Sequence, residues 1–395
     1  GKARRRLDRE RLRRRARERN VLQVCHRRGG GTERQLRAEA DLLRMGGAAV
    51  FELRPVDGEE SHVLLSSPDV PLTPNLQGCS LLDAALVESL RALRITEIHV
   101  HSLIDFEIEA PALMVRLAEC AGAKIHLRIH DYEVICPRIT LTGADGRYCG
   151  EPAEAECNRC LKALGADFPV TDIEKWRSRP VGMLRIAAEI VVPDADVAQR
   201  MDRYFPALPI IVRPHDNDDD LNLPQVCSQL SASEPLRVVV VGAINRPKGY
   251  EILLACAMQA RKRMLPIRFI LMGYSIDDTA LEEAGVEVTG RYREETAVET
   301  LDGFAAHAVW LPSIWPETYS FTLSLALLAG LPVFAFDLGA IAGRLRTLGR
   351  ADHLMPLDDA EHPAAINTRF LGFRERCIAA ARNSGLVGQM NEAGQ

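Results

Sequence analysis

Two segments of this 395-residue chain begin in the same way, with a short apolar run that leads into glycine. The first run is Val21–Cys25, which leads to three consecutive glycines at 29–31, and the second is Leu236–Val241, which leads to Gly242. A β-branched run that ends in glycine and precedes a helical pattern is typical of the first strand of a parallel α/β unit. Because this beginning occurs twice, we expect two doubly wound α/β domains in series.

Further strand-like runs follow each beginning, and helical patterns such as 110–121 separate some of them. These runs are 49–53, 98–101, 125–129 and 189–192 in the first half, and 267–271, 286–288, 308–311 and 332–336 in the second. A polar stretch at 214–235 lies between the halves and has the composition of a linker. We interpret Asp216 and Asp218 within it as solvated residues, because no strand-like run delivers them to a metal site.

The charge of the chain is unevenly distributed. Residues 2–19 hold eleven Lys or Arg and three Asp or Glu, a local charge of +8. Because the whole chain has a net charge of −5, the remainder carries −13. An acidic body excludes a dedicated nucleic-acid binder, which would carry its basic patch on the fold. We interpret residues 1–19 as a basic tail or linker, either solvated or in contact with an anionic membrane face.

The composition also limits where the chain resides. No apolar run approaches the roughly 18–20 residues of a spanning helix, and the arginine-rich start lacks the apolar core of a secretory signal. We therefore expect a cytoplasmic protein, with the inner face of the membrane as the place of any peripheral contact. Gly1 is not a natural start, which indicates a trimmed chain or part of a longer polypeptide.

The loop after the second glycine beginning has residue types that bind anions. It reads Gly242-Ala243-Ile244-Asn245-Arg246-Pro247-Lys248-Gly249. Glycines let the backbone approach an anion, and a helix that follows offers free N–H groups and the positive end of its dipole. Arg246 and Lys248 add full charges, which can stabilise a diphosphate leaving group. A solvated basic loop is the alternative interpretation.

A second loop carries a carboxylate between a strand and a helix. Glu317 and Thr318 follow the run 308–311, and a helical pattern then continues to Gly330. A carboxylate at this position can accept hydrogen bonds from sugar hydroxyls while the amides of the helix start hold phosphate. The alternative is a glutamate that only stabilises the start of the helix, and spacing alone leaves both interpretations open.

Residues 236–345 resemble the nucleotide-binding domain of the family 4 retaining glycosyltransferases. The fold of that family is GT-B, in which two doubly wound Rossmann-like domains face a cleft. The resemblance is carried by the loop at 242–249, Gly273, 288–292, Pro312–Thr318, 329–333 and 336–340. The first half is similar in its glycine loop at 29–34, in His130-Asp131-Tyr132 and in 192–206, so the resemblance covers about 20–345.

The resemblance implies roles for individual residues. Lys248 would bind the donor diphosphate, Glu317 would contact the donor sugar, and His130 would lie beside the reacting sugar, so these three are the catalytic candidates. The candidates for donor binding are Gly30, Gly31, Gly242, Asn245, Arg246, Gly273, Arg291, Tyr292, Thr318, Tyr319 and Ser320. The resemblance implies a nucleotide-sugar donor, a glycan or lipid-linked acceptor, retention of configuration, a role in polysaccharide biosynthesis and no catalytic metal.

Two positions depart from the family pattern. The family's second glutamate, which holds the ribose, is Leu325 here, and the arginine that often follows the first glycine is Ala243. These departures leave a second hypothesis open: a non-catalytic GT-B domain that binds partners or glycans inside a larger assembly protein. Of the other histidines, we expect only one of His99 and His101 to face the cleft, and His101, at the strand's end, is the better candidate.

Four of the ten cysteines lie close together in the sequence, at Cys136, Cys149, Cys157 and Cys160. The final Cys-x-x-Cys has the spacing that holds one tetrahedral metal, and a long loop beside a cleft gains stability from such a metal. A structural zinc is therefore one interpretation. Reduced thiols packed in the loop, or disulfides, are the alternatives.

These observations give a domain plan. The basic tail is followed by an acceptor-side domain at 20–213 with a Cys-rich loop at 136–160, and by a nucleotide-sugar-binding domain at 214–365. Residues 366–395 have a helical pattern, which we expect to pack back across the first domain and to end loosely from Gly388.

Overall fold

A computed structural model describes residues 19–67, 78–216, 218–221 and 230–392 of the chain. The chain forms two compact units, and the division falls between His215 and Asp216, except that residues 145–148 belong to the second unit. The predicted basic tail lies outside the described residues up to position 18.

The first unit is built on a seven-stranded sheet with the order β3-β2-β1-β4-β5-β6-β7. Only β3 is antiparallel to its neighbour. The strands are β1 (Asn20–Val24), β2 (Ala49–Val56), β3 (Glu59–Ser66), β4 (Glu97–Val100), β5 (Lys124–Arg128), β6 (Glu189–Val192) and β7 (Ile210–Val212). The helices are α2 (Gly30–Met45), α3 (Ala84–Ala92), α4 (Ala110–Ala121), α5 (Glu154–Leu164), α6 (Ile173–Ser178), α7 (Val181–Ile186) and α8 (Ala195–Tyr204).

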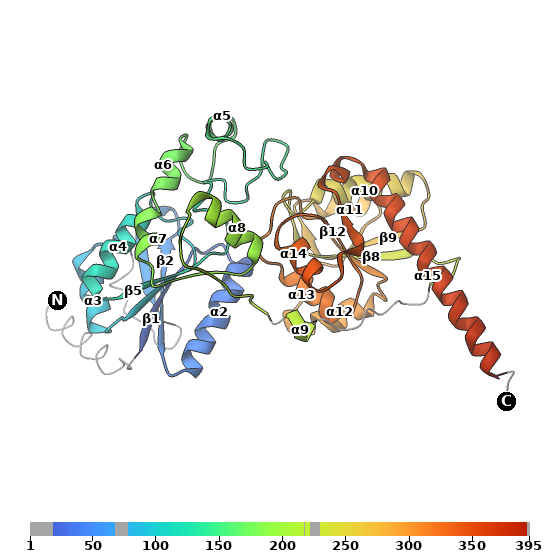
Figure 1. The fold of residues 1–395 in the computed structure, drawn as a ribbon, viewed down its shortest axis with the longest axis horizontal. Coiled ribbons are helices and arrows are strands. Elements are labelled where there is room, and N and C mark those ends of the chain that lie inside the picture. Colours follow the sequence, from blue (N-terminus) through green and yellow to red (C-terminus); the bar gives the residue numbers. More distant parts are fainter. Residues whose placement is uncertain (1–18, 68–77, 217, 222–229, 393–395) are drawn as a thin grey trace. The chain divides into compact units, whose positions relative to one another are not determined.

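The two faces of this sheet differ in chemistry. Figure 1 shows α2 on one side of the strands and α3, α4 and α7 on the other. Alternate residues of β4 and β5, such as Ile98 and Leu127, are buried and apolar. The intervening residues Glu97, His99 and His126 are polar and share the opposite face, because side chains alternate along a strand. A parallel sheet is normally apolar on both faces, so this polar strip calls for a functional explanation.

The second unit is built on a six-stranded sheet with the order β10-β9-β8-β11-β12-β13, and all its strands are parallel. The strands are β8 (Leu236–Ile244), β9 (Ile267–Ser275), β10 (Glu287–Val288), β11 (Ala308–Leu311), β12 (Val333–Phe336) and β13 (Leu354–Met355). The helices are α9 (Asp218–Leu221), α10 (Tyr250–Lys262), α11 (Asp278–Glu283), α12 (Ala297–Gly303), α13 (Phe321–Leu328), α14 (Gly339–Thr347) and α15 (Pro363–Glu392), with short 3₁₀ turns at 294–296, 351–353 and 357–361.

Apolar residues fill both faces of the second sheet. Val238 and Val240 of β8 join a core that includes Trp310 and residues of α10 and α15. Val239 and Val241 point to the other face and join a core that includes residues of α12, α13 and α14. This alternation within one strand explains why the run from 236 to 241 is apolar without interruption.

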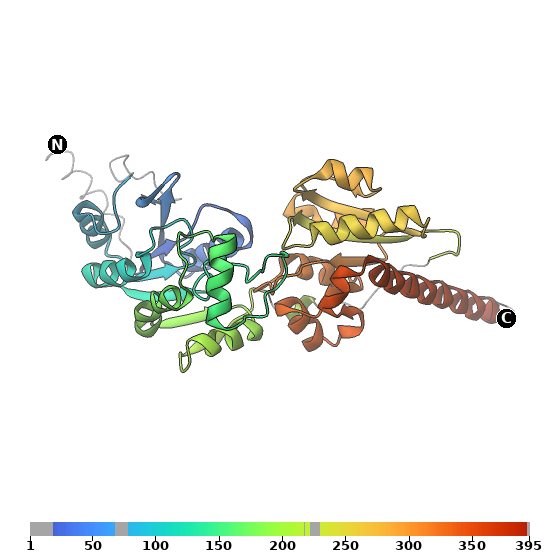
Figure 2. The same cartoon turned by 90° about the horizontal axis from the view of Figure 1, so that it is seen from above.

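The C-terminal helix differs from the prediction. Ile366, Phe370 and Phe373 of α15 are buried in the core of the second unit, where this part of the helix packs against α10. Packing of the helix across the first domain stays a prediction. The helix continues through Gly388, where the sequence predicts a loose end, and its last turns project beyond the second sheet (Figures 1 and 2).

All the strands predicted from apolar runs are present, and the described residues form three further strands that were not predicted. The strand β3 pairs with β2 through a turn at Asp57-Gly58, which is a recognisable hairpin signal. The strands β7 and β13 have only three and two residues, too few for a periodic pattern. In the part of the chain that the structure describes, no helix combines the length and apolar character needed to cross a membrane.

Candidate functional site

The strand order of the second unit places the loop after β8 next to the loop after β11. The chain runs outward from β8 in one direction through β9 and β10, and then returns to the other side of β8 with β11. Ligands of open α/β sheets bind at such a reversal of strand order, beyond the carboxyl ends of the strands. The loops that follow β8 and β11 are the two that carry Lys248 and Glu317.

Direct contacts hold these two loops together. The amide of Ile314 donates to the carbonyl of Pro247 over 2.9 Å. Gly249, which precedes α10, has a φ of +84°, and a Cβ at this position would lie 2.1 Å from the carbonyl oxygen of Pro312. Only glycine permits both the left-handed backbone and this close approach. The structure therefore brings the predicted Lys248 loop against the predicted Glu317 loop.

The Lys248 loop is a tight turn that leaves its ammonium group available. Asn245 shapes the turn, because its side-chain oxygen accepts from the amide of Lys248 over 3.1 Å and its carbonyl accepts from the amide of Tyr250. Arg246 is exposed and pairs with Glu251 at 2.9 Å. Among the described residues, no carboxylate lies within ion-pair distance of the Lys248 ammonium. Lys248 is thus the better of the two cations for an anionic ligand.

Glu317 is a largely buried residue with a carboxylate that is unpaired within the described part of the chain. It is 8% exposed, and no described residue donates a hydrogen bond to its side chain or forms an ion pair with it. Its carbonyl accepts from the amide of Ala340 over 3.0 Å. Gly339, with a φ of +61°, packs so closely on Pro316 that a Cβ would lie 2.7 Å from the Cα of that proline. The backbone of Glu317 is therefore fixed, while its carboxylate is left for a ligand.

The residues after Glu317 build the start of α13. Ser320 caps the helix, because its hydroxyl accepts from the amide of Leu323 over 3.3 Å. Thr318 and Tyr319 are buried beside it. Burial raises the pKa of Tyr319 to about 12, and its hydroxyl donates to the carboxylate of Asp216 over 3.0 Å. Tyr319 therefore acts as a neutral structural donor at the helix start.

The prediction that Asp216 and Asp218 are solvated linker residues is wrong. Asp216 also accepts from the hydroxyl of Ser324 over 2.6 Å, and Asp218 forms a bidentate pair with Arg344. Arg344 is buried, donates to the carbonyl of Ser320 over 2.9 Å and stacks on the ring of Tyr319. A buried charge without a partner is costly, and these contacts supply partners for all three charged groups. Through Ser324 and Arg344, the two acids anchor the linker to α13 and α14.

Three of the predicted donor-binding residues, Gly273, Arg291 and Tyr292, lie in β9 or after β10. Gly273 and Gly242 are register partners, and a Cβ on Gly273 would lie 2.0 Å from the carbonyl of Gly242, which explains the pair of glycines. Arg291 is exposed and stacks on the ring of Tyr274, with its guanidinium carbon 4.4 Å from the ring centre. Tyr292 and Leu325 are partly buried against the α13 side of the core.

The first unit places His130 in a chain of polar groups. His130 follows β5, and its Nε2 lies 3.0 Å from Nδ1 of His101, which follows β4. The Nε2 of His101 lies 2.7 Å from a carboxylate oxygen of Glu39 on α2. The rings of His101 and His130 are stacked with centres 5.2 Å apart, and the ring of His215 lies 5.5 Å from that of His130.

The charges and burial of Glu39, His101 and His130 determine which of these groups carry a proton. Although burial by itself raises the pKa of Glu39, its contacts with His101 and His99 outweigh this and hold the pKa well below the usual range. Burial, together with the charges of His101 and His215, lowers the pKa of His130. A carboxylate beside His101 Nε2 requires a proton there, so His101 Nδ1 accepts from His130 Nε2. His130 is therefore a neutral imidazole near neutral pH.

We predicted that only one of His99 and His101 would face the cleft, but the two side chains leave the strand on the same face. Residues two apart in a strand share a face, and both histidines reach Glu39, His99 through Nδ1 at 3.3 Å. The predicted Gly30 and Gly31 lie at the start of α2 and are exposed, with φ of +77° at Gly30.

The four clustered cysteines lie in the first unit as free thiols. Burial raises the pKa of Cys136 to about 12, and the neighbouring thiolate charges of Cys149, Cys157 and Cys160 add to this, which indicates that the four groups are near one another. In the described part of the chain, however, the only group with three donor atoms within 4.8 Å of one another is Glu97, His99 and His126. Zinc at the cysteines stays a prediction.

Sequence reasoning missed several residues that complete these sites. Glu39 and Arg344 both lie within helical patterns and look like surface charges in the sequence. Both instead point into their units, where Glu39 holds His101 and Arg344 holds Asp218. A weak signal for a buried polar partner was present in the sequence. The runs 97–101 and 124–128 carry polar residues at alternating positions, which indicates one polar strand face.

Comparisons with known proteins agree with this architecture. Residues 235–371 match the family described as Glycosyl transferases group 1. No curated protein sequence matches the chain significantly. Sucrose-phosphate synthase from Thermosynechococcus elongatus is similar in structure, with 17% identity, a TM-score of 0.56 and coverage of 96% of this chain and 100% of that one. HepE from Anabaena, in complex with UDP-glucose, has 16% identity, a TM-score of 0.52 and coverage of 94% of each chain. The predicted GT-B fold is thereby confirmed.

Proposed function

We propose that this chain is a retaining glycosyltransferase that moves a sugar from a nucleotide-sugar donor to a glycan or lipid-linked acceptor. The second unit would bind the donor, and the first unit would contribute His130 and bind the acceptor. The observation that carries the proposal is Glu317, a largely buried residue whose carboxylate has no partner among the described residues. A carboxylate that the protein leaves unpaired can accept hydrogen bonds from a ligand, and sugar hydroxyls are suitable donors.

Charge supports the choice of a diphosphate donor. Lys248 lies on the loop that contacts the Glu317 loop, and the start of α13 follows Glu317 directly. An ammonium group and the amides of a helix start bind phosphate oxygens. When the bond between the sugar and the diphosphate breaks, negative charge grows on the phosphate, and these groups stabilise it.

The neutral His130 fits the acceptor side of this reaction. The acceptor hydroxyl would attack the anomeric carbon on the face from which the diphosphate leaves, and its proton would pass to the departing phosphate. A neutral imidazole can orient a sugar hydroxyl by a hydrogen bond without adding charge. Glu39 and His101 would act as positioning residues, because they fix the ring and the tautomer of His130.

The first experiment is a binding and transfer assay with a panel of nucleotide sugars. UDP-glucose is a reasonable first member, because HepE was solved with it. Lys248→Ala and Glu317→Gln are each expected to reduce transfer by about 10²–10³-fold, which is the usual effect of removing one stabilising group. Lys262→Ala, at the exposed end of α10, is the matched control and should keep full activity.

One result would count against the proposal: no nucleotide or nucleotide sugar binds, although circular dichroism shows a folded chain. A specific observation favours that outcome, since Leu325 is packed on the core where the resemblance implies a ribose-binding glutamate. The alternative function is then a non-catalytic GT-B domain that binds partners or glycans. Such a domain should keep its partner binding in both the Lys248→Ala and the Glu317→Gln variants.

The finer parts of the proposal have separate tests. Retention of configuration is measured by NMR of the anomeric proton in the product, and an inverted product would refute it. A role in polysaccharide assembly at the inner face of the membrane predicts that vesicles with anionic lipids bind the full chain, and that a chain lacking residues 1–18 binds them less.

We also propose a structural zinc at Cys136, Cys149, Cys157 and Cys160. Support comes from the donor set, which suits zinc, and from the mutual electrostatic effect of the four thiols. Zinc bound there would hold the loop between β5 and α5 in shape. Metal analysis of the purified chain tests this, since Cys157→Ser with Cys160→Ser should remove this ion.

A further inference from the structure

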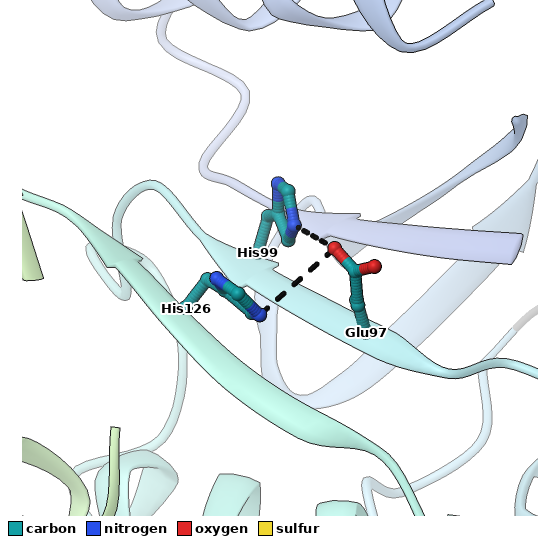
Figure 3. Close-up of side chains that lie close together, drawn as sticks. All are labelled: Glu97, His99 and His126. Carbon is teal, nitrogen blue, oxygen red and sulfur yellow. Dashed lines mark hydrogen bonds and ion pairs between the residues drawn. The ribbon is translucent and has the colours of Figure 1, made fainter. Parts of the chain in front are cut away.

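We propose that Glu97, His99 and His126 form a second metal site, which binds one zinc-type divalent ion on the α2 side of the first sheet. This site is separate from the four cysteines and does not depend on the proposed transferase function. Figure 3 shows the three side chains on one face of two adjacent strands, with both imidazoles directed at the same carboxylate. Two imidazoles and one carboxylate are a ligand set that zinc uses.

The register of the sheet creates this cluster. His99 of β4 and His126 of β5 are direct register partners, so their side chains leave the sheet next to each other, with ring centres 4.9 Å apart. Glu97 lies two residues before His99 and therefore projects from the same face. The backbone of two central strands thus fixes the origin of all three side chains, as a specific metal site requires.

The donor atoms have the separations of a metal site. The Nε2 of His99 lies 3.0 Å and the Nε2 of His126 lies 3.9 Å from the same oxygen of Glu97. A tetrahedral ion with bonds of about 2.0–2.2 Å needs donor separations of about 3.4 Å, between these two values. Small rotations of the side chains would therefore bring the three donors to an ion.

The remaining nitrogens of the two histidines also face carboxylates. The Nδ1 of His99 lies 3.3 Å from Glu39, and the Nδ1 of His126 lies 3.6 Å from Glu189. Both Nδ1 atoms are buried without a hydrogen bond of good geometry. A histidine that binds a metal usually directs its other nitrogen to a carboxylate, which fixes its orientation. Each of the two histidines has such a carboxylate, Glu39 for His99 and Glu189 for His126.

Arginines hold the surrounding carboxylates without closing the site. Arg128 bridges Glu39 and Glu189, with contacts of 2.8 Å to each. Arg19 pairs with both oxygens of Glu97, at 2.7 and 2.8 Å. A metal on the Glu97 oxygen that faces the histidines would leave the other oxygen to Arg19. The arginines would then set the affinity by opposing the charge of the ion.

A cavity provides a path to the site and a place for a further ligand. It has a volume of about 560 Å³, and its lining includes His99, His126, Glu39 and Glu189. The side chain of His99 is 2% exposed, and those of Glu97 and His126 are 17% and 18% exposed. With three protein ligands, the fourth position of a tetrahedral ion would point to water or to a small molecule in this cavity.

The test must separate this site from the four cysteines. The full chain carrying Cys157→Ser and Cys160→Ser is made metal-free by dialysis and is titrated with Zn²⁺ by calorimetry. One Zn²⁺ per chain is expected, together with a rise in melting temperature. His126→Gln and, independently, Glu97→Gln are expected to weaken this binding by at least tenfold, while His362→Gln, an exposed histidine of the second unit, should leave it unchanged.

Cobalt supplies a readout that does not depend on stability. Co²⁺ bound in the double-serine chain should give weak visible bands without the strong near-ultraviolet band of a thiolate ligand, and His126→Gln should remove these bands. Circular dichroism checks that each variant is folded. The proposal is overturned if the double-serine chain binds no Zn²⁺, or if folded His126→Gln and Glu97→Gln variants bind it as well as their parent.

Discussion

Replacing Gly249 by alanine tests whether the close contact between the two loops of the second unit builds the site. The new Cβ would lie 2.1 Å from the carbonyl oxygen of Pro312, well inside the 3.0 Å limit for such contacts. The residue also has a φ of +84°. The left-handed conformation costs alanine about 1–2 kcal/mol, and forcing an extra methyl group into packed structure typically costs about 1–3 kcal/mol more.

Gly349→Ala is the matched control for this variant. Gly349 lies in the same unit with a φ of +69°, and nothing lies within 4 Å of its Cβ position. It therefore carries the conformational cost of about 1–2 kcal/mol without the steric cost. We expect Gly249→Ala to reduce the stability of the second unit by about 2–5 kcal/mol, because both costs apply.

The measurement is hydrogen exchange followed by mass spectrometry on peptides from β8. The strand β8 lies in the middle of the second sheet, so its amides report the free energy of opening of this unit. Nucleotide binding by the folded fraction is a second readout, since a displaced Pro312 would shift the loop that carries Glu317. Equal destabilisation by Gly249→Ala and Gly349→Ala, with nucleotide binding retained, would refute the reasoning.

Three further predictions concern buried charges and the ribose position. Arg344→Met should lower the stability of the second unit by about 3–5 kcal/mol, measured by urea denaturation, because it leaves Asp218 without its buried partner; a loss below 1 kcal/mol would contradict this. Burial, with the Asp131 charge adding to it, raises the pKa of Glu133. Its protonated form therefore favours folding below the ordinary carboxyl pKa, and this contribution is lost as the pH rises through the raised value. Glu133→Gln should accordingly stabilise the first unit more at pH 8 than at pH 5, and a pH-independent effect on urea denaturation would contradict the assignment. Leu325→Glu should tighten nucleotide binding about tenfold, as expected for one hydrogen bond to a charged group; calorimetry that shows unchanged or weaker binding by a folded variant would argue against a ribose contact at this position.

Local patterns in the sequence were sufficient for much of the fold. Apolar runs such as 236–241 identified the strands because the residues that make a buried parallel strand are adjacent in the chain. The glycines at the ends of these runs also marked the loops that follow β1 and β8. Since the carboxyl ends of parallel strands meet at one edge, Lys248 and Glu317 could be assigned to one region before their loops were seen in contact.

The pairing of charged groups could not be predicted in the same way. Asp218 and Arg344 are 126 positions apart, and each alone looks like a surface residue. The linker was therefore predicted to be solvated, although the Asp216 and Asp218 carboxylates are bound to α13 and α14. Nothing local distinguishes an arginine that reaches solvent from one that points into the protein.

The sequence by itself determined the two α/β domains and the order of most strands along the chain, because these features depend on residues that are neighbours in the chain. Only the tertiary structure decided which side chains meet. His99 and His126 became partners through the register of β4 and β5, and Glu39 reached His101 from the facing helix α2. Register and helix packing depend on the whole core, so the alternating polar residues were visible in the sequence but their partners were not.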